Sequence, residues 1–468
     1  MSEKKTKKSL TSFTILFIII LVLAAVTWLI PGDAVTGATL ANIAMAPVEG
    51  FNDAIDVCVF VLILGGFLGI VTKTGALDNG IAVLVKKLHG KELVLIPVLM
   101  TLFSIGGSTY GMLEETVPFY LLLASTMVSA GFDSVVGAAM VLLGAGSGCL
   151  GSTINPFAVG AAQAAVPESI TLNNGLVIGI GAALWLSTLL ISIFFVMSYA
   201  KKVKADKGST ILSLQEQQDM KAEFIDKKQD EVVEAKLTGA QKLVLCLFAL
   251  TFVVMIIGFI PLGSFGITAL ENTAWFTYYP LGEWYFQEAS CWFLLMAIII
   301  GIVGKLDENT LVNTFLAGVS DMVGVVMIIA LARGASVLMA ATGLDQYLLA
   351  KMAEILNGMS AGIFAPLAYI LYIPLSFLVP SSSGLGALSM PIMAPLAHEL
   401  GFSAEVMIMI FVAANGLVNL FTPTCGAIMG GPAIAKIQYS TWIKFATKII
   451  VTIAIVNIVI LTACMLFI

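Results

Sequence analysis

Residues 147–156 read Ser-Gly-Cys-Leu-Gly-Ser-Thr-Ile-Asn-Pro, a run of small and polar residues inside a long apolar segment. Irregular backbone at membrane depth is tolerated only where protein buries it or where it lines a cavity. The run therefore predicts a membrane helix that is interrupted around a site. A second run, Asn-Gly-Leu-Val-Asn-Leu-Phe-Thr-Pro-Thr at 415–424, predicts a second interrupted helix.

Composition sets the class of protein. The 468 residues are 59% hydrophobic and 11% charged, with a mean hydropathy of +1.02, which is typical of an all-α polytopic membrane protein. The six cysteines occur singly, so neither a disulfide framework nor a zinc site is indicated. The chain has no phosphate-binding Gly-Lys-Ser/Thr loop and no His-Glu-x-x-His motif, which argues against a primary pump and a metallohydrolase. Nothing in the sequence supports nucleic-acid binding.

The apolar segments divide the chain into two halves. The first half, 1–200, contains a retained first helix, an inside-opening re-entrant hairpin at about 91–130 and an interrupted helix at about 133–166. A polar segment, 201–240, is expected to be a solvated cytoplasmic linker. The second half, 241–468, contains an outside-opening hairpin at about 361–397 and an interrupted helix at about 405–435. We expect the hairpins to break at 106–111 and 380–384.

The two halves align almost without gaps. Gly111 matches Gly384 at an offset of 273, and Pro156 matches Pro423 at an offset of 267. Such a small drift favours an internal duplication. Because an odd number of predicted crossings separates equivalent spans, the halves face opposite ways and form an inverted repeat.

Positive charges predict the orientation. Of the 23 cationic side chains, only Arg333 and Lys351 lie outside segments that we place on the cytoplasmic face, including the tail with Lys4, Lys5, Lys7 and Lys8. We therefore expect a multi-pass protein of the cytoplasmic (inner) membrane, with its N-terminus inside and its C-terminus outside.

Two interrupted helices and two hairpins would bring free backbone groups together near the membrane midplane. Half-helix N-termini favour a carboxylate, and exposed carbonyl, Asn or Thr oxygens can hold Na⁺. The expected function is alternating-access transport. A channel is the competing class, because broken helices also build selectivity filters, and counterflow distinguishes the two.

The motif at 106–120, Gly-Gly-Ser-Thr-Tyr-Gly-Met-Leu-Glu-Glu-Thr-Val-Pro-Phe-Tyr, resembles the signature of a known family. It is similar to the YfcC branch of the anaerobic four-carbon-dicarboxylate carrier (DcuC-like) family, which includes arginine/ornithine exchangers and resembles the ion-transporter superfamily. The likeness covers nearly the whole chain. It implies a scaffold domain that forms a homodimer and a transport domain that moves like an elevator.

The resemblance also implies the site residues. Related symporters hold substrate and sodium with Ser-Asn-Thr-type motifs at hairpin tips and helix breaks, although the strict triplet is missing here. Small polar residues that only allow close helix packing are the competing explanation. Na⁺ is expected at Ser108, Asn155, Ser382 and Asn419, with Na⁺ or H⁺ as coupling ion and no organic cofactor. The matching positions are Ser108, Thr109, Ser152, Thr153, Asn155, Ser381, Ser382, Ser383, Asn419, Thr422 and Thr424.

Charged residues at membrane depth are expensive and mark functional hypotheses. Glu114 and Glu115 have no acidic counterpart in the second half, and since adjacent helical residues point different ways, we expect Glu115 alone to face the site. Arg333, the only arginine, either binds a substrate carboxylate or pairs with a glutamate. The glutamates favour a basic amino acid, as in arginine/ornithine exchange, with Na⁺- or H⁺-coupled dicarboxylate transport as runner-up.

The remaining ionisable groups have ordinary explanations. Asp53, Asp56 and Asp321 lie close to predicted helix starts and are expected to cap helices or lie at an interface. His89 and His398 are interpreted as surface residues, and His398 as a group that can tune the pH response.

Overall fold

The computed structural model describes residues 11–30, 32, 34–77, 79, 80, 83, 91–117, 119–226, 236–260, 262–265 and 270–468. The expectations for the four tail lysines, for His89 and for residues 227–235 of the linker lie outside these ranges. Across the described residues, every regular element is helical, and eight helices are long and apolar enough to cross a membrane.

The first half consists of helices and short helical turns. They are α1 (Ser12–Leu29), α2 (Leu40–Asp53), α3 (Ile55–Lys73), η1 (Glu92–Val94), α5 (Leu95–Tyr110), η2 (Glu114–Thr116), α6 (Phe119–Ser129), α7 (Ser134–Leu150), η3 (Pro156–Gly160), α8 (Ala161–Ala164) and α9 (Asn174–Ala205).

The linker and the second half follow. They comprise η4 (Lys207–Ser209), α10 (Leu214–Lys221), η5 (Ala222–Asp226), α12 (Gly239–Phe259), η6 (Leu262–Phe265), η7 (Glu271–Trp275), α13 (Phe286–Val303), α14 (Glu308–Thr342), α15 (Leu344–Leu356), α16 (Ala361–Leu378), α17 (Ser382–Glu399), α18 (Ala404–Val418), α19 (Gly426–Ile434) and α20 (Tyr439–Phe467).

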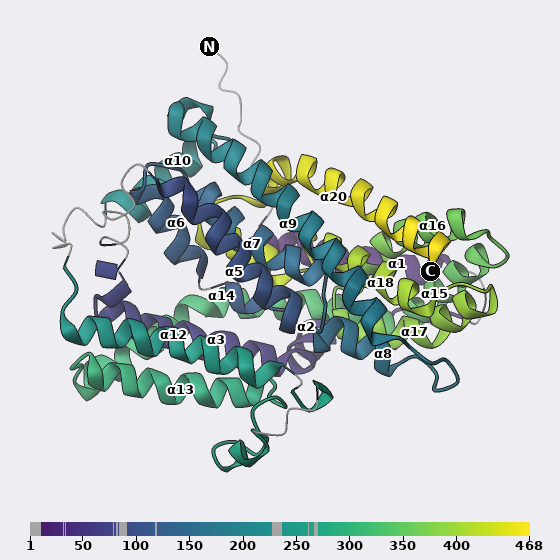
Figure 1. Cartoon of the computed structure of the whole chain (residues 1–468), viewed down its shortest axis with the longest axis horizontal. Helices are drawn as coiled ribbons and strands as arrows, with labels where there is room; N and C mark the ends of the chain where they lie inside the picture. The colour runs from purple at the N-terminus through teal and green to yellow at the C-terminus, as the bar shows by residue number, and fades with distance from the viewer. Residues whose placement is uncertain are drawn as a thin grey trace.

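The helices pack in two groups. The scaffold group consists of α1, α2, α3, α12, α13 and α14, in which α14 packs along α1, α2 and α3, and α13 packs on α3 and α12. The hairpin group consists of α5–α9 and α16–α20, with α7 and α18 in contact at its centre. Figure 1 shows α3, α12 and α13 as one layer along a long side of the molecule, with α5, α7 and α9 beside it.

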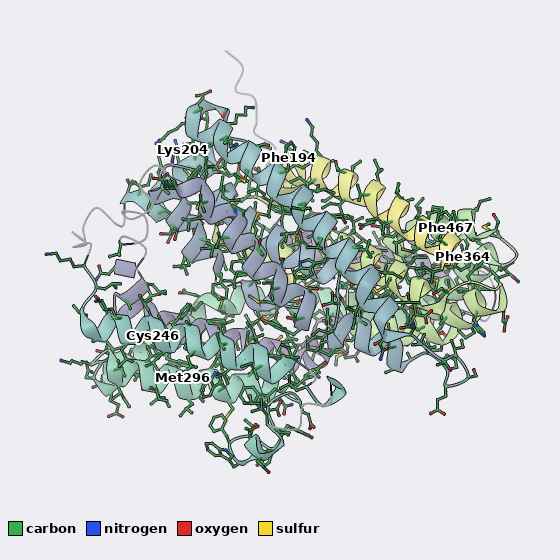
Figure 2. All side chains as sticks on the ribbon, viewed as in Figure 1. Phe194, Lys204, Cys246, Met296, Phe364 and Phe467 are labelled. Atoms are coloured by element: carbon green, nitrogen blue, oxygen red, sulfur yellow. The ribbon has the colours of Figure 1, made fainter. Side chains whose placement is uncertain are left out.

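Apolar side chains cover the outer faces of the long helices. Figure 2 labels Phe194 on α9 and Phe467 at the end of α20, and both are strongly exposed. The central helices are the opposite, because α7 and α18 are buried along their whole lengths. A buried helix pair surrounded by apolar outer helices is the arrangement expected of a polytopic membrane protein, in which polar function lies inside.

One order of elements occurs twice. A helix, a turn, a second helix, an interrupted helix and a long final helix make up α5 to α9 and again α16 to α20. The duplication and the inverted orientation of the two halves stay predictions.

Three of the four predicted breaks begin later in the chain than expected, and the fourth, expected at 380–384, is at 379–381 because α17 already begins at Ser382. Ser147 to Leu150 are helical, and the first interruption is 151–155; the second is 419–425 rather than 415–424. Residues 106–110, expected to break the first hairpin, end α5 instead, and the chain leaves the helix at Gly111 with a φ of +82°. The small residues before each break allow helices to approach closely: a Cβ at Gly107 would overlap α7, and one at Gly148 would overlap α5.

Helix α2 is the main element that the sequence analysis missed. It occupies the polar stretch after α1, contains Pro47, and packs along α14. A Cβ at Gly334 would lie 2.5 Å from the Ala46 carbonyl oxygen, so the two backbones are in direct contact. Asp321 also differs from expectation, since it lies inside the 35-residue helix α14 and not near a helix start.

Part of the linker packs against the helices, whereas the sequence analysis expected all of it to be solvated. Met220 and Phe224 are buried, and Glu216 is 1% exposed. The Glu216 carboxylate accepts hydrogen bonds from the backbone N–H of Ser213 at 2.7 Å and of Gln438 at 2.8 Å. One side chain therefore caps the N-termini of both α10 and α20.

Candidate functional site

The two interruptions meet at one cavity of about 100 Å³. Its wall contains residues of both breaks, the turn after α5, the tip between α16 and α17, and α14. A cavity needs only about 10–15 Å³ to hold one ordered water, so this space has room for several. The predicted site residues that line it are Glu114, Glu115, Asn155, Arg333, Ser381, Ser382, Ser383, Asn419 and Thr424.

The second break presents amide groups to this cavity. Asn415 and Asn419 are one helical turn apart, and the Asn419 Nδ2 donates to the Asn415 Oδ1 at 3.2 Å. The Asn415 Nδ2 and the Asn419 Oδ1 are buried and have no hydrogen-bond partner among the described residues. An unsatisfied buried polar atom costs about 1–3 kcal/mol, so a free donor and a free acceptor at one cavity favour a polar ligand there.

The tip of the second hairpin closes over these amides. Ser382, the first residue of α17, donates from its Oγ to the Asn415 Oδ1 at 2.6 Å. Ser381 caps the same helix by accepting from the Gly384 N–H at 3.1 Å. The first residues of α17 therefore line the cavity, and a helix N-terminus favours a carboxylate.

The first hairpin is joined to the first break in a similar way. The Ser108 Oγ lies 3.1 Å from the Thr153 Oγ1, and the Thr153 N–H donates to the Ser108 carbonyl at 3.0 Å. The Asn155 Oδ1 accepts from the Phe157 N–H at 2.9 Å and caps the turn that follows. Hydrogen bonds thus fix each hairpin to the break of its own half.

Five predicted site residues do not line the cavity. Their side chains bond within the protein: Ser152 donates to Cys149, Thr109 to Ile105, and the Thr422 Oγ1 lies 2.6 Å from the Thr424 Oγ1. These hydroxyl groups therefore already have hydrogen-bond partners inside the protein. The five residues are Ser108, Thr109, Ser152, Thr153 and Thr422.

The two glutamates differ in their surroundings although both line the cavity. Glu115 is 2% exposed, and its Oε2 accepts from the Leu113 N–H at 2.9 Å. Glu114 is half-buried, and its carboxylate has no hydrogen bond among the described residues. Glu115 therefore shapes the turn, while Glu114 presents a free negative charge to the cavity.

Arg333 reaches the cavity from α14. Its guanidinium forms an ion pair with the Asp53 carboxylate at 3.7 Å, and neither side chain is fully buried. The sequence analysis expected Arg333 to contact a substrate or pair with a glutamate, and the structure adds Asp53 as a partner. Asp56 accepts from the Gln287 side chain at 2.9 Å, and His398 lies exposed in the last turn of α17.

A second cavity of about 490 Å³ adjoins the first. The two share wall residues, Arg333 and the tip serines Ser381 and Ser383 among them. Asp53, Asp56 and Asp345 line the larger cavity but not the smaller one. Arg333 therefore lies where the larger cavity, with its acidic wall residues, meets the smaller one.

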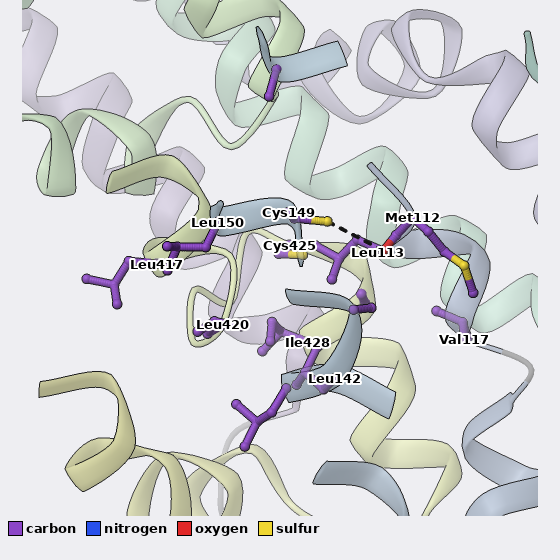
Figure 3. Close-up of a cluster of buried hydrophobic side chains, with 14 of the residues drawn as sticks. Met112, Leu113, Val117, Leu142, Cys149, Leu150, Leu417, Leu420, Cys425 and Ile428 are labelled. Carbon is purple, nitrogen blue, oxygen red and sulfur yellow. Dashed lines mark hydrogen bonds between the residues drawn. The ribbon is translucent and has the colours of Figure 1, made fainter. Parts of the chain in front are cut away.

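Several wall residues carry no chemical signal that sequence reasoning could detect. Leu113, Cys149 and Cys425 line the cavity, and the Cys149 Sγ lies 3.4 Å from the Met112 carbonyl oxygen. Figure 3 shows these side chains together with Leu150, Leu417 and Leu420, which pack where α7 and α18 end. Asn415 was the one missed residue with a signal, because it opens the polar run that predicted the second break.

A family model described as "C4-dicarboxylate anaerobic carrier" (DcuC) matches residues 33–466. The chain belongs to the DcuC family. A DcuC-family relative, an "Uncharacterized protein" of Haemophilus influenzae (strain ATCC 51907 / DSM 11121 / KW20 / Rd), is 30% identical over 409 residues, or 87% of this chain and 75% of the relative. YfcC of Escherichia coli (strain K12), whose name provisionally describes a basic amino acid antiporter, is 28% identical over 433 residues, or 89% and 79% of the two chains.

Two solved transporters also align with this DcuC-family chain. The YdaH transporter of Alcanivorax borkumensis has a TM-score of 0.48 and 14% identity, covering 97% of this chain and 98% of that one. MtrF of Neisseria gonorrhoeae has a TM-score of 0.45 and 17% identity, covering 98% and 96%. The family match and the apolar helices together identify a multi-pass membrane transporter and not an enzyme.

Proposed function

We propose that this DcuC-family protein exchanges basic amino acids, such as arginine and ornithine, across the cytoplasmic membrane by alternating access. The observation that carries the proposal is the free carboxylate of Glu114 in a cavity that also holds the unpaired amide atoms of Asn415 and Asn419. A half-buried carboxylate without a hydrogen-bond partner favours a cation, and a guanidinium or ammonium group supplies one.

Each polar group of such a substrate has a complementary partner. Glu114 would accept from the cationic side chain, which bonds a carboxylate strongly. The Asn415 Nδ2 and the N-terminus of α17 would donate hydrogen bonds to the α-carboxylate. The Asn419 Oδ1 would accept a hydrogen bond from the α-ammonium group. We assign the cationic contact to Glu114 in place of Glu115, because the Glu115 carboxylate is already held by Leu113.

The two packing groups supply the parts of an alternating-access mechanism. In the proposal, the hairpin group carries the substrate and moves against the scaffold group, as the elevator resemblance implies. The larger cavity faces the outside in the orientation predicted from the lysines, and the scaffold group provides a homodimer interface in the inner membrane. Measuring the mass of the purified protein in native detergent complexes tests the dimer.

A coupling cation remains part of the proposal. Na⁺ binds oxygen ligands, and the Asn419 Oδ1 is a buried oxygen without a partner, so the second break fits such an ion. The Ser382 and Asn155 oxygens also line the cavity, although both already take part in hydrogen bonds, and Ser108 lies behind the wall. Arginine uptake with Na⁺ replaced by choline tests the coupling.

Glu114→Gln and Glu115→Gln test the substrate assignment in liposomes. A hydrogen bond to a charged group contributes about 1.5–3 kcal/mol, so we expect Glu114→Gln to reduce arginine uptake about 10–150-fold. Glu115→Gln retains an acceptor for the Leu113 N–H and should have a smaller effect. Full arginine counterflow by Glu114→Gln would refute the assignment.

Transport of a four-carbon dicarboxylate is the second candidate. The description of the matching family and the presence of Arg333 at the cavity favour it. Two carboxylates would then need Arg333 and a coupling cation to offset Glu114. A thermal-shift screen of the purified protein with amino acids and dicarboxylates, with and without Na⁺, separates the candidates, because a bound ligand raises the melting temperature.

A further inference from the structure

The two opposite charges at the cavity belong to different packing groups. Glu114 lies on η2, next to α6 in the hairpin group, whereas Arg333 lies on α14 in the scaffold group. Both line the same cavity, whose wall also contains Cys425. Any movement of one group against the other therefore changes the distance between these two charges.

Arg333 is fixed to the scaffold. The next residue, Gly334, is in backbone contact with α2, so this part of α14 packs directly on that scaffold helix. Asp53, the last residue of α2, holds the guanidinium at 3.7 Å. An ion pair of this length between partly exposed side chains is weak, so the guanidinium is free to change partners.

Glu114 is the acidic group best suited to become the new partner of Arg333. Its carboxylate has no hydrogen bond among the described residues, while Glu115 is already held by the turn. Among the described residues, Arg333 is the one cationic side chain that lines either cavity. In a medium of low polarity, an uncompensated carboxylate attracts such a guanidinium strongly.

We propose that pairing between Glu114 and Arg333 locks the empty carrier and makes transport an obligatory exchange. Without substrate, the Glu114 charge is held by the scaffold cation, and the hairpin group stays in place. A bound basic amino acid neutralises Glu114, so the loaded hairpin group passes Arg333. This inference rests on the proposed basic amino acid exchange and adds the reason why an empty carrier would not return.

The test compares two fluxes of radiolabelled arginine from preloaded liposomes. Net efflux is measured into buffer without substrate, and exchange is measured into buffer with unlabelled arginine. We expect the wild type to show little net efflux relative to exchange, and Arg333→Gln to raise the ratio at least fivefold. Arg333→Lys keeps the charge and should give the wild-type ratio.

Asp53→Asn is the matched control. It removes the other partner of Arg333 and leaves the proposed pair with Glu114 intact, so the ratio should not rise. Three results would overturn the lock. Two concern Arg333→Gln: an unchanged ratio of net efflux to exchange, or loss of both fluxes. The third is a rise of this ratio in Asp53→Asn that equals the rise in Arg333→Gln. Wild-type net efflux as fast as exchange would overturn the lock alone, whereas no basic amino acid flux in either assay would overturn the proposed function as well.

Discussion

The contact between the two interrupted helices gives the sharpest stability prediction. Gly416 on α18 lies against Leu150 at the end of α7, and a Cβ at 416 would overlap the Leu150 Cα and would lie 2.8 Å from the Leu150 nitrogen and 2.9 Å from its Cβ. Ordinary contact begins at 3.4 Å, so Gly416→Ala requires the helices to separate by at least 3.4 − 2.8 = 0.6 Å. Leu150 is fully buried, and the closest atoms belong to its backbone, so no flexible side chain can absorb the shift.

Overpacking of this kind costs about 1–3 kcal/mol. For a chain of this size, we expect the melting temperature in detergent to fall by about 1–6 °C. The same shift displaces Asn415 and Asn419, so arginine exchange should fall as well. Thermal unfolding followed by tryptophan fluorescence measures the first effect, and liposome exchange measures the second.

Gly324→Ala is the matched control, because Gly324 also lies inside a helix and a Cβ there would meet nothing within 4 Å. Alanine is the better helix former by about 1 kcal/mol, so this variant should be as stable as the wild type or more so. If Gly416→Ala behaves like Gly324→Ala in both assays, the close approach of the two interrupted helices is wrong.

Three further changes test other parts of the structure. Ser382→Ala removes the hydrogen bond to Asn415, which contributes about 0.5–1.5 kcal/mol, so arginine affinity should fall about 2–12-fold, while Ser360→Ala, at a cap without a side-chain bond, should not change it. Glu216→Ala leaves the N-termini of α10 and α20 without their carboxylate and should lower the melting temperature, whereas Asp219→Ala on the exposed face of α10 should leave it unchanged. Ser381→Cys should react with an impermeant maleimide from outside in right-side-out vesicles; labelling only from inside would reverse the predicted orientation.

Much of the architecture could be predicted because the bilayer restricts it so strongly. Long apolar runs became helices, and the polar runs near Asn155 and Asn419 became interruptions at one cavity. The positions of the breaks were less predictable. Glycine permits both a break and a close helix contact, and only the partner helix decides between them, as it does at Gly148.

The site was predictable to the extent that its residues were polar. Ser382 and Asn419 were identified, but apolar wall residues such as Leu113 carry no signal until the fold is known. The pairing of Arg333 with Asp53 also required the structure, because α2 was hidden in a stretch of low hydrophobicity. The assignment of Glu114 in place of Glu115 depended on one hydrogen bond, to the Leu113 N–H.

The two native thiols in the cavity wall bear on any chemical probing of this carrier. Cys149 and Cys425 are both unpaired and both border the space where the substrate is proposed to bind. Burial disfavours the thiolate form that attacks a methanethiosulfonate, so modification of these two thiols should be slow, and an occupying solute should slow it further. Studies that introduce reporter cysteines therefore need a background in which these two positions are first replaced. In the natural protein, the rate at which these two thiols are modified would report whether the cavity is occupied.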